Sequence, residues 1–406
     1  MRVGIDFGTS NTSVAVKTPD GVKLLELEPG TTSIPTAIFY ELSSRDYSIG
    51  NPALEDYEAG EDGRLMRSIK SVLGTSLIEE TTQIGNRATP FRQVILDFLS
   101  QLMAKVEKTT GQKVTHVTQG RPVSFNDDDP SRDAMAQAVL ADCLKETGVL
   151  EVEFLFEPVA AARSVRFGDD GERIAFVVDI GGGTSDFSVV RLTGGEDGFE
   201  VLGSSGVYVG GNDFDRILSF FELTPLFGRT ETLELNGLPT PSAPYVTLSD
   251  WKSHNRLYLP AAAKEIAWMR KFGPSSKGIQ ALEYLVENFE AGLYAHKTEA
   301  AKIALSGADE AAFHYDADDI HLSKHLMRAA FEDLISETIA TMHRVADACL
   351  AEAGVRKPDV TDIIMVGGST FIPAVEDGFR AEFPQASLSA NDRFGAVAKG
   401  LALHGG

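Results

Sequence analysis

Cysteine is scarce in this chain: Cys143 and Cys349 are the only two in 406 residues, and they lie far apart. A disulfide-stapled secreted fold is therefore disfavoured, and both thiols are interpreted as buried structural groups of a protein in a reducing compartment. Long hydrophobic runs are also missing, so no segment predicts a membrane span. The first residues, Met1 to Asp6, lack the apolar core of a secretory signal. The sequence thus predicts a cytoplasmic location and no membrane partner.

Basic clusters are missing as well. The formal net charge is −22, from 37 Lys and Arg residues against 59 Asp and Glu residues. Without a local basic patch, this charge would repel nucleic acid, so no nucleic-acid partner is expected. The hydrophobic share of 43% is that of an ordinary globular protein. A length of 406 residues exceeds what one core usually serves, so we expect at least two lobes.

Two common phosphate-binding signatures are also absent. No G-x-x-x-x-G-K-[ST] segment occurs, which excludes a P-loop enzyme. The run Gly181-Gly182-Gly183 does not extend to G-x-G-x-x-G, because Asp186 occupies the position of the last glycine. A dinucleotide-binding fold is therefore disfavoured.

What the sequence does contain is a repeated hairpin pattern at residues 3–16 and 176–190. Both segments read as a strand, an aspartate, a glycine turn with Thr and Ser, and a second strand. The two aspartates, Asp6 and Asp179, stand 173 residues apart, which is the size of a domain rather than of a solenoid repeat. We infer two related halves, each opening on the same hairpin.

A second correspondence supports this duplication. Residues 114–122 predict a strand followed by a helix through residues 135–140, and residues 360–367 predict a strand followed by a helix near residues 374–383. Each half therefore combines early hairpin strands with a later strand-helix unit, which is an α/β pattern with mixed sheets.

The expected domains follow from this arrangement. We expect lobe I at residues 1–165 with an inserted subdomain at about 30–110, lobe II at 166–390 with an inserted helical subdomain at about 216–305, and a C-terminal helix at 391–406 that returns to lobe I. Further expected features are helices at 91–106 and 322–353, a strongly periodic helical block at 282–304, and an exposed loop at 230–250.

The residues of the two turns suit a phosphate group. Glycine lets a ligand approach backbone N–H groups closely, and Thr and Ser hydroxyls add donors. A single such turn would be explained as an ordinary tight hairpin, but two related turns with an acid beside each favour a ligand site. Asp6 and Asp179 would be costly as lone dehydrated carboxylates, and they are explained if they share Mg²⁺, which prefers oxygen ligands and keeps most of its waters.

Five segments, in their order along the chain, resemble the nucleotide-binding domain of the 70-kDa heat-shock chaperones: residues 6–11, 157–162, 179–186, 210–215 and 366–370. Single pieces also occur in sugar kinases and bacterial actins, but the set is specific and spans nearly the whole chain. The resemblance implies an α/β, duplicated actin-like ATPase (ribonuclease H-like) fold, with two lobes that each carry an inserted subdomain and with the nucleotide in the cleft.

The resemblance also implies roles for individual residues. Asp6 and Asp179 would hold a hydrated Mg²⁺, and Lys70 would lie by the γ-phosphate and help to place the attacking water. Glu157 and Asp186 would order water and metal nearby. The residues alone also allow Lys70 to be a surface lysine and Glu157 a helix N-terminal charge. The implied contacts with ATP or ADP are Gly8, Thr9, Ser10, Asn11, Gly181, Gly182, Gly183, Thr184, Gly210, Gly211, Gly367, Gly368 and Ser369, and Thr184 is also assigned to catalysis.

The adenosine end departs from the family pattern. Glu299, Lys302 and Ser306 match the family's Glu-x-x-Lys-Arg-x-x-Ser helix end and would bind the ribose side. Ile303 and Phe371 stand where the family has two arginines that sandwich the adenine. A phenyl ring stacks on a base without the cation–π attraction of arginine, although Phe371 could equally be a core residue.

The expected function is slow, Mg-dependent ATP hydrolysis with nucleotide-driven lobe closure, in a chaperone-type protein that has a protein partner or client. The chain stops at Gly406, where the family continues with a linker and a peptide-binding domain, so it resembles short bacterial members of the family. A small-molecule kinase of the same superfamily stays open, although the sequence identifies no acceptor pocket or general base. An actin-like filament protein and a non-hydrolysing nucleotide sensor also stay open.

Two smaller patterns are interpreted as structural. His321 and His325 stand four residues apart, and we expect a solvated helix face rather than a metal site. The run Asp127-Asp128-Asp129 predicts a loop and a helix N-cap before Pro130.

Overall fold

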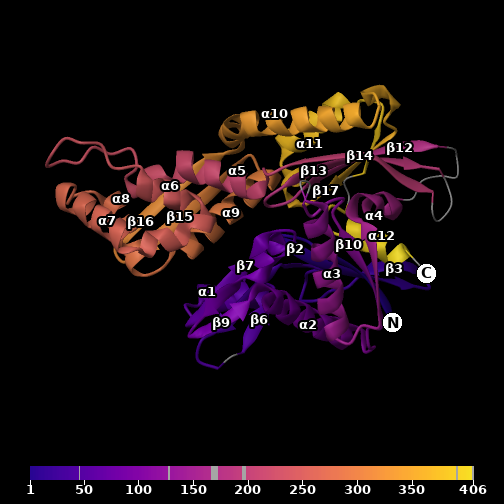
Figure 1. Ribbon diagram of the computed structural model, residues 1–406. Coiled ribbons are helices and arrows are strands. Elements are labelled where there is room, and N and C mark those ends of the chain that lie inside the picture. Colours follow the sequence, from indigo (N-terminus) through magenta and orange to yellow (C-terminus); the bar gives the residue numbers. More distant parts are fainter. Residues whose placement is uncertain (45, 127–128, 166–171, 194–197, 390–391, 405–406) are drawn as a thin grey trace. The chain divides into compact units, whose positions relative to one another are not determined.

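The computed structural model describes residues 1–44, 46–126, 129–165, 172–193, 198–389 and 392–404 (Figure 1). Its internal contacts form two compact units. Unit 1 comprises Met1–Tyr208, Arg344–Thr370 and Gly378–Gly406, and unit 2 comprises Val209–His343 and Phe371–Asp377. The lobe boundaries predicted after residues 165 and 390 fall at segments outside the described residues.

Unit 1 contains two central sheets with equivalent strand orders. The first has the order β11-β10-β1-β2-β3, with β4 also paired to β2, and the second has the order β14-β13-β12-β17-β18. The strands of the first sheet are β1 (Arg2–Phe7), β2 (Asn11–Thr18), β3 (Gly21–Leu24), β4 (Ser33–Pro35), β10 (His116–Arg121) and β11 (Glu151–Phe156). Those of the second are β12 (Arg173–Ile180), β13 (Ser185–Leu192), β14 (Phe199–Val207), β17 (Asp362–Val366) and β18 (Ser387–Ser389).

The pairing in the two sheets confirms the predicted duplication. In each sheet three consecutive strands pair antiparallel, β1 to β3 in one and β12 to β14 in the other. In each sheet two later strands then extend the first hairpin strand in parallel, β10 and β11 in one and β17 and β18 in the other. The mixed α/β, actin-like ATPase fold expected from the sequence is therefore the observed one.

Two helices between the sheets hold them together. Helix α4 (Glu157–Ser164) and helix α12 (Ala396–Leu403) pack closely against one another, as Figure 1 shows. Gly400 makes this approach possible, because a Cβ atom there would lie 1.7 Å from the backbone oxygen of Ala160. Helix α12 also packs on β1, where a Cβ on Gly4 would lie 2.4 Å from the nitrogen of Ala402. Small residues thus fix the two sheets to one shared helical layer.

The remaining elements of unit 1 surround the first sheet. Its large apolar core joins that sheet to α2, which buries residues such as Phe98 and Leu102, and to α3, which buries Leu140 and Cys143. Asp129 caps α3 by accepting hydrogen bonds from the backbone of Ser131, as predicted, whereas Asp127 and Asp128 lie outside the described residues. The elements are β5 (Ala37–Glu41), β6 (Tyr47–Ile49), α1 (Asn51–Glu58), β7 (Gly63–Arg67), η1 (Ile69–Val72), η2 (Ser76–Glu79), β8 (Thr81–Ile84), β9 (Arg87–Pro90), α2 (Phe91–Thr110) and α3 (Pro130–Glu146). The short element η6 (Lys357–Asp359) instead precedes β17 of the second sheet.

Unit 2 is mainly helical around one two-stranded sheet. Its core is aromatic: Phe227 contacts the rings of Tyr294 and Tyr315, and Tyr294 also contacts Phe313. Its elements are α5 (Gly211–Leu218), η3 (Ser219–Leu223), η4 (Thr224–Phe227), α6 (Ala243–Ser249), η5 (Trp251–Tyr258), α7 (Pro260–Phe272), α8 (Lys277–Glu287), α9 (Ala291–Gly307), β15 (Glu310–Ala317) and β16 (Ile320–Met327). Helices α10 (Arg328–Glu352) and α11 (Pro373–Glu382) contribute residues to both units, and η7 (Gly368–Phe371) ends at their boundary.

Three local predictions need correction. Residues 322–327 are not helical, because they belong to β16, which pairs with β15 along its whole length before α10 begins. The periodic block at 282–304 is interrupted between α8 and α9, where Phe289 adopts a left-handed backbone with φ of 59°. The predicted loop at 230–250 ends in helix α6, which begins with a proline in its first turn.

His321 and His325 therefore lie on a strand rather than on a helix. Both side chains are exposed, and each contacts an acid across the hairpin, His321 with Asp316 and His325 with Glu310. The two histidines thus lie on a solvated surface, as expected, but that surface belongs to a strand and not to a helix. Both cysteines are buried and free, and burial raises the pKa of each thiol to about 11. Among the described residues, no helix is long and apolar enough to cross a bilayer.

Candidate functional site

The two hairpin turns have the same hydrogen-bonded geometry. Gly8 N donates to Asn11 O at 3.0 Å, and Gly181 N donates to Thr184 O at 3.0 Å. A Cβ atom on Gly8 would lie 2.4 Å from Asn11 O, so only glycine fits the first turn. The residues between the ends of each turn, 9–10 and 182–183, are partly exposed. Both turns therefore leave residues accessible at their tips, which is what the predicted phosphate contacts would require.

A hydroxyl group from another strand or loop fixes each turn. Thr36 Oγ1 donates to Gly8 O at 2.8 Å, and Ser369 Oγ donates to Gly181 O at 3.0 Å. Thr36 also receives a hydrogen bond from Thr12, since its own proton is used by Gly8, and its backbone N donates to Ser10 O. Both hydroxyl groups are nearly buried. These contacts restrict the turn carbonyls, so the N–H groups of the turns keep one direction.

Thr36 is a positioning residue that the sequence did not single out. Its only signal was the Pro35-Thr36 pair between two apolar segments, which is too common to be informative. Ser369 was predicted to contact the nucleotide, and its hydroxyl group is instead engaged with the turn backbone. The structure thus gives Ser369 the same relation to the second turn that Thr36 has to the first.

Aspartates lie next to both turns. Asp6 faces Ser13 across the β1/β2 hairpin, and Asp179 faces Asp186 at the equivalent register of the β12/β13 hairpin. Burial raises the pKa of Asp6 to about 7, and repulsion from Glu157 adds to this effect. Burial, followed by repulsion from Glu157, Asp186 and Asp6, raises the pKa of Asp179 well above its usual range. Glu157 thus repels both aspartates, and Asp6 repels Asp179, so the two aspartates belong to one site.

Lys70 supplies the positive charge of this site. It lies in η1 after Ser68, whose left-handed backbone with φ of 55° turns the chain inward. Its Nζ donates to Glu157 Oε1 at 2.7 Å, and both side chains are largely buried. Burial works to lower the pKa of Lys70, but the carboxylates of Glu157, Asp6 and Asp179 outweigh it and raise the pKa overall. Lys70 is thus a buried cation in contact with the acidic site and not a surface lysine.

Glu157 owes its place to the start of α4. The residue opens this helix, with Pro158 next to it, and an acid in the first turn suits the positive end of the helix dipole. The helix-terminal interpretation and the functional one are therefore compatible. Glu157 forms an ion pair with Lys70, and its charge also repels the carboxylates of Asp6 and Asp179 in the two hairpins.

The acids fit a hydrated divalent cation better than a fully protein-bound one. No group of three His, Cys, Asp or Glu side chains converges as direct ligands within the part of the chain that is described. Mg²⁺ usually takes one or two carboxylates and fills its other positions with water and phosphate oxygens. Asp6 and Asp179, whose pKa values are raised by burial first and by neighbouring acids second, match this donor set.

A glycine turn after β17 lies against Asp179. Gly367 has a φ of 85°, and a Cβ atom there would lie 2.4 Å from Ile180 O and 3.0 Å from Asp179 Oδ1. Glycine is therefore required for β17 to end beside the second hairpin. Gly368 follows, and Arg393 donates to the backbone oxygen of Thr370, which helps to fix this turn.

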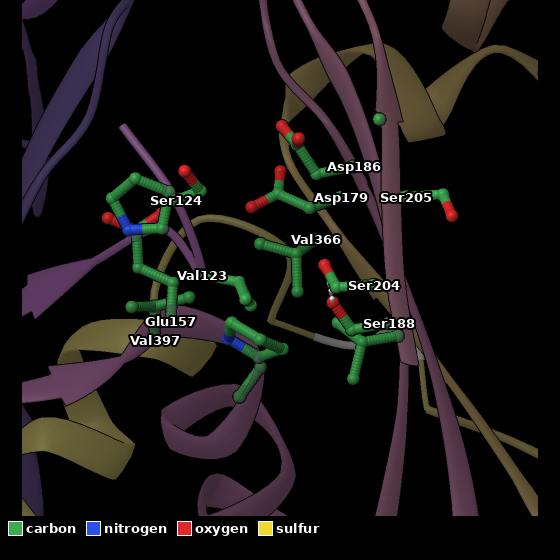
Figure 2. A pocket seen from close by; sticks show the side chains of 15 residues that line it. Val123, Ser124, Glu157, Asp179, Asp186, Ser188, Ser204, Ser205, Val366 and Val397 are labelled. Atoms are coloured by element: carbon green, nitrogen blue, oxygen red, sulfur yellow. Dashed lines mark hydrogen bonds between the residues drawn. The ribbon is translucent and has the colours of Figure 1, made fainter. Parts of the chain in front are cut away.

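A pocket opens beside the acids within unit 1, as Figure 2 shows. Its volume is about 340 Å³. Asp179 and Asp186 lie side by side at one end, and Ser188 and Ser204, joined by a 3.0 Å hydrogen bond, lie farther along the same sheet. Glu157 lies on the opposite wall. The sequence did not predict this pocket, because its walls come from six helices and strands and from the loop at residues 122–124, which are distant in the chain.

Unit 2 holds the residues predicted for the adenosine end. Lys302 Nζ contacts Asp215 Oδ2 at 2.8 Å and Gly211 O at 3.3 Å, and it is buried. Asp213 accepts a hydrogen bond from Gly210 N at 3.0 Å and so caps α5. The acids of the Gly-Gly-Asn-Asp-Phe-Asp run therefore fix the loop and the lysine in place. Lys302 reaches this loop through an ion pair, which sequence comparison alone did not indicate.

The other predicted residues of unit 2 lie on accessible surface. Glu299 and Ser306 are partly exposed on α9, on the turns that precede and follow Lys302. Ile303 is 61% exposed and Phe371 is 42% exposed. Phe371 is therefore not a core residue, and Ile303 offers an apolar surface to solvent.

Comparison with known proteins agrees with this geometry. The family model described as "Hsp70 protein" matches residues 80–236 and 292–406. A "Chaperone protein DnaK" from Psychrobacter cryohalolentis is 27% identical, and a "Chaperone protein HscA homolog" from Shewanella denitrificans is 28% identical. Each alignment covers 99% of this chain but 58% of the relative, so the chain spans less than two thirds of the length of these curated relatives.

Proposed function

Because the chain belongs to the Hsp70 family, we propose that it binds Mg-ATP at the two hairpin turns and hydrolyses it slowly. The observation that carries this proposal is the buried Lys70–Glu157 ion pair beside Asp6 and Asp179. Lysine is almost never fully buried unless it is paired with an acid. Buried ionisable groups with shifted pKa values are typical of functional sites.

The chain's own groups account for the binding of the phosphates. The N–H groups of residues 9–10 and 182–183 surround the β- and γ-phosphates, and the hydroxyls of Thr36 and Ser369 keep the turns in shape. Mg²⁺, when bound, neutralises phosphate charge and relieves the repulsion between Asp6 and Asp179. Preformed turns need little reorganisation when the phosphates bind.

Lys70 and the acids account for the hydrolysis. In the transition state, negative charge spreads over the oxygens of the transferred phosphoryl group, and a fixed cation stabilises it. The contact with Glu157 holds the Lys70 ammonium in place. Asp186 and Glu157 accept hydrogen bonds from the attacking water and orient it. Slow turnover is expected, since no strong base is dedicated to the water.

The wider role of the protein is proposed from the family to which the chain belongs. Nucleotide-driven closure of the two lobes would change the surface offered to a protein partner, in a chaperone-type cycle in the cytoplasm. Glu299, Lys302 and Ser306 would bind the ribose, next to the Gly210-Gly211 loop, with Ile303 and Phe371 bracketing the adenine.

Calorimetry with Mg-ATP and single-turnover hydrolysis test this proposal together. Micromolar or tighter binding that disappears with EDTA, followed by ADP formation, is the expected result. Binding of Mg-ATP without any hydrolysis would contradict the proposed ATPase activity and would favour a non-hydrolysing nucleotide sensor. A pull-down compared in ATP and in ADP then tests for a partner that changes with the nucleotide.

A further inference from the structure

We propose that the outer face of helix α7 in unit 2 docks an acidic amphipathic helix of a partner protein. We call Lys264, Ala267 and Lys271, together with the neighbouring Trp268, the α7 face. The helix lies within residues 237–291, between the two stretches that match the family model, so the family match does not account for this surface. The inference goes beyond the proposed ATPase activity, because docking on α7 needs neither nucleotide nor metal.

The charge around α7 is opposite to that of the whole protein. Residues 251–277 contain six Lys and Arg residues but a single acid, Glu265, whereas the chain has 37 Lys and Arg residues against 59 Asp and Glu residues. The six are spread along the segment, so no run of neighbouring basic residues marks it in the sequence. A positive surface on an acidic molecule selects a negatively charged partner.

The lysines of the α7 face are available to such a partner. Arg270, on the same helix, is already engaged with Glu283 at 3.3 Å. Lys264 and Lys271 are exposed, and neither forms an ion pair within the part of the chain that the structure describes. Lys271 Nζ lies 5.6 Å from the centre of the Phe272 ring, which is a contact with an uncharged group. Both lysine charges are therefore uncompensated by acids of this chain.

Helix α7 turns one side to the protein and the other to solvent. Ile266 and Met269 are buried. Lys264, Ala267 and Lys271 follow one another at intervals of three and four residues, so they share the opposite, exposed side. At 1.5 Å per residue, the 13 residues of α7 extend over about 20 Å. The α7 face therefore has the length of a partner helix of three to four turns.

Apolar side chains accompany the lysines. Trp268 stands between them on the helix, and its ring packs on that of Phe272 with centroids 5.1 Å apart. An exposed leucine lies at each end of α7. Leu259 precedes the first residue and is 53% exposed, and Leu235, whose backbone N donates to Phe272 O at 2.9 Å, is 64% exposed. Tryptophan is enriched among the residues that dominate interfaces, so the occupant needs apolar groups as well as negative charge.

The length and charge of the surface favour a helix over a long polyanion. A nucleic-acid strand or an anionic bilayer extends beyond α7 and would meet the acidic remainder of the molecule, where exposed charges repel one another over about 8 Å in physiological salt. An amphipathic helix of matching length stays on the α7 face. Its apolar side packs on Trp268 and Ala267, and its Asp and Glu residues reach Lys264 and Lys271.

The experiment uses the full chain without nucleotide and reads the emission of Trp268. Trp251→Phe makes Trp268 the only tryptophan, since the chain has two. The probe is a 15-residue peptide with Leu and Ala along one side of its helix and Glu along the other. One reference peptide has Lys in place of Glu, and a second has the probe's residues in scrambled order. We expect the acidic peptide to bind at micromolar concentration and to shift the emission to shorter wavelength, the Lys peptide to give no shift, and the scrambled peptide to bind at least tenfold more weakly.

A charge-reversed pair tests the location. Lys264→Glu with Lys271→Glu should weaken binding of the acidic peptide about tenfold. Lys108→Glu with Lys145→Glu is the matched control, because it changes the net charge equally at exposed positions of α2 and α3, and it should leave the affinity unchanged. Circular dichroism and thermal melting show that both variants are folded. Calorimetry with Mg-ATP is run separately, so a failure of the nucleotide site is distinguished from a failure of the α7 face.

Three results would overturn the proposal. The first is equal binding of the acidic and the scrambled peptide, or no binding of either. The second is an equal loss of affinity in both charge-reversed variants, which would assign the effect to net charge and not to α7. The third is tighter binding of a 15-nucleotide uridine oligomer, or of vesicles that contain phosphatidylglycerol, than of the acidic peptide, which would assign the surface to another class of ligand.

Discussion

The ammonium of Lys70 lies 2.7 Å from the carboxylate of Glu157, although the two residues are 87 positions apart in the chain. One comes from η1 of the inserted segment and the other from the start of α4. The pair is buried, and aspartates from both hairpins influence its charge. A desolvated cation is thus held in position before any ligand binds, which is the arrangement that the proposed phosphate chemistry requires.

Lys70→Ala should bind Mg-ATP and hydrolyse it much more slowly. Loss of one transition-state charge contact is worth about 3 kcal/mol, or roughly a hundredfold in rate. Single-turnover hydrolysis of bound ATP measures this effect. Lys108→Ala, an exposed lysine near the end of α2, is the matched control. An unchanged rate in Lys70→Ala would assign the ion pair a structural role only.

Asp179→Asn should lose most of its affinity for Mg-ATP. The same change removes one of several mutually repelling acids, so the melting temperature without metal and nucleotide should stay equal or rise. Calorimetry and thermal melting measure the two effects on the same sample. Asp142→Asn, on an exposed position of α3, should change neither. Equal Mg-ATP affinity in Asp179→Asn and the parent protein would remove this residue from the site.

The metal-free protein should lose stability as the pH rises from about 4 to 7. Asp6 has a pKa of about 7 when folded, against 3.8 as its ordinary value. In this window the folded state retains a proton that the unfolded state has released, so raising the pH favours unfolding. Denaturant unfolding of Asp6→Asn should show a flatter pH profile than that of the parent. Parallel profiles for the two proteins would contradict the shifted pKa.

Thr36→Val should weaken Mg-ATP binding without a large loss of fold stability. The hydroxyl that holds Gly8 O would be missing, and one hydrogen bond is worth roughly 1 kcal/mol, or about fivefold in affinity. Thr36→Ser keeps the hydroxyl and should restore the affinity. Ser369→Ala should act in the same way on the second turn. If the Val and Ser variants bind equally well, the hydroxyl does not position the turn.

Phe371→Arg should tighten ADP modestly, by ~1 kcal/mol, because a guanidinium adds cation–π attraction to the stacking surface. Phe371 is 42% exposed, so the longer side chain does not disturb a core. Titration calorimetry with ADP measures the change. Ile303→Arg is the companion variant on the other predicted side of the base. A structure with bound nucleotide that places the adenine away from both residues would refute the assignment.

The sequence alone determined the repeated framework. Two Asp-containing glycine turns, 173 residues apart, predicted two equivalent hairpins, and the strand orders of both sheets confirm them. This succeeded because hairpin turns depend on local residues, above all on Gly8, where no other side chain fits. The prediction failed at residues 322–327, where apolar residues of a helical spacing form β16 because the partner strand β15 was not recognised.

The tertiary structure decided the contacts around that framework. The sequence singled out Lys70 and Glu157 only through family resemblance. The fold buries both side chains, brings them together as an ion pair, and places Asp6 and Asp179 close enough to raise the pKa of Lys70. No sequence pattern indicated Thr36 as the support of the first turn, or the pocket beside Asp186. Such features join residues from distant elements, and no local pattern records which side chains will meet. Hairpins follow from short-range backbone preferences, whereas the charge and shape of the site follow from how the two sheets pack on α4 and α12.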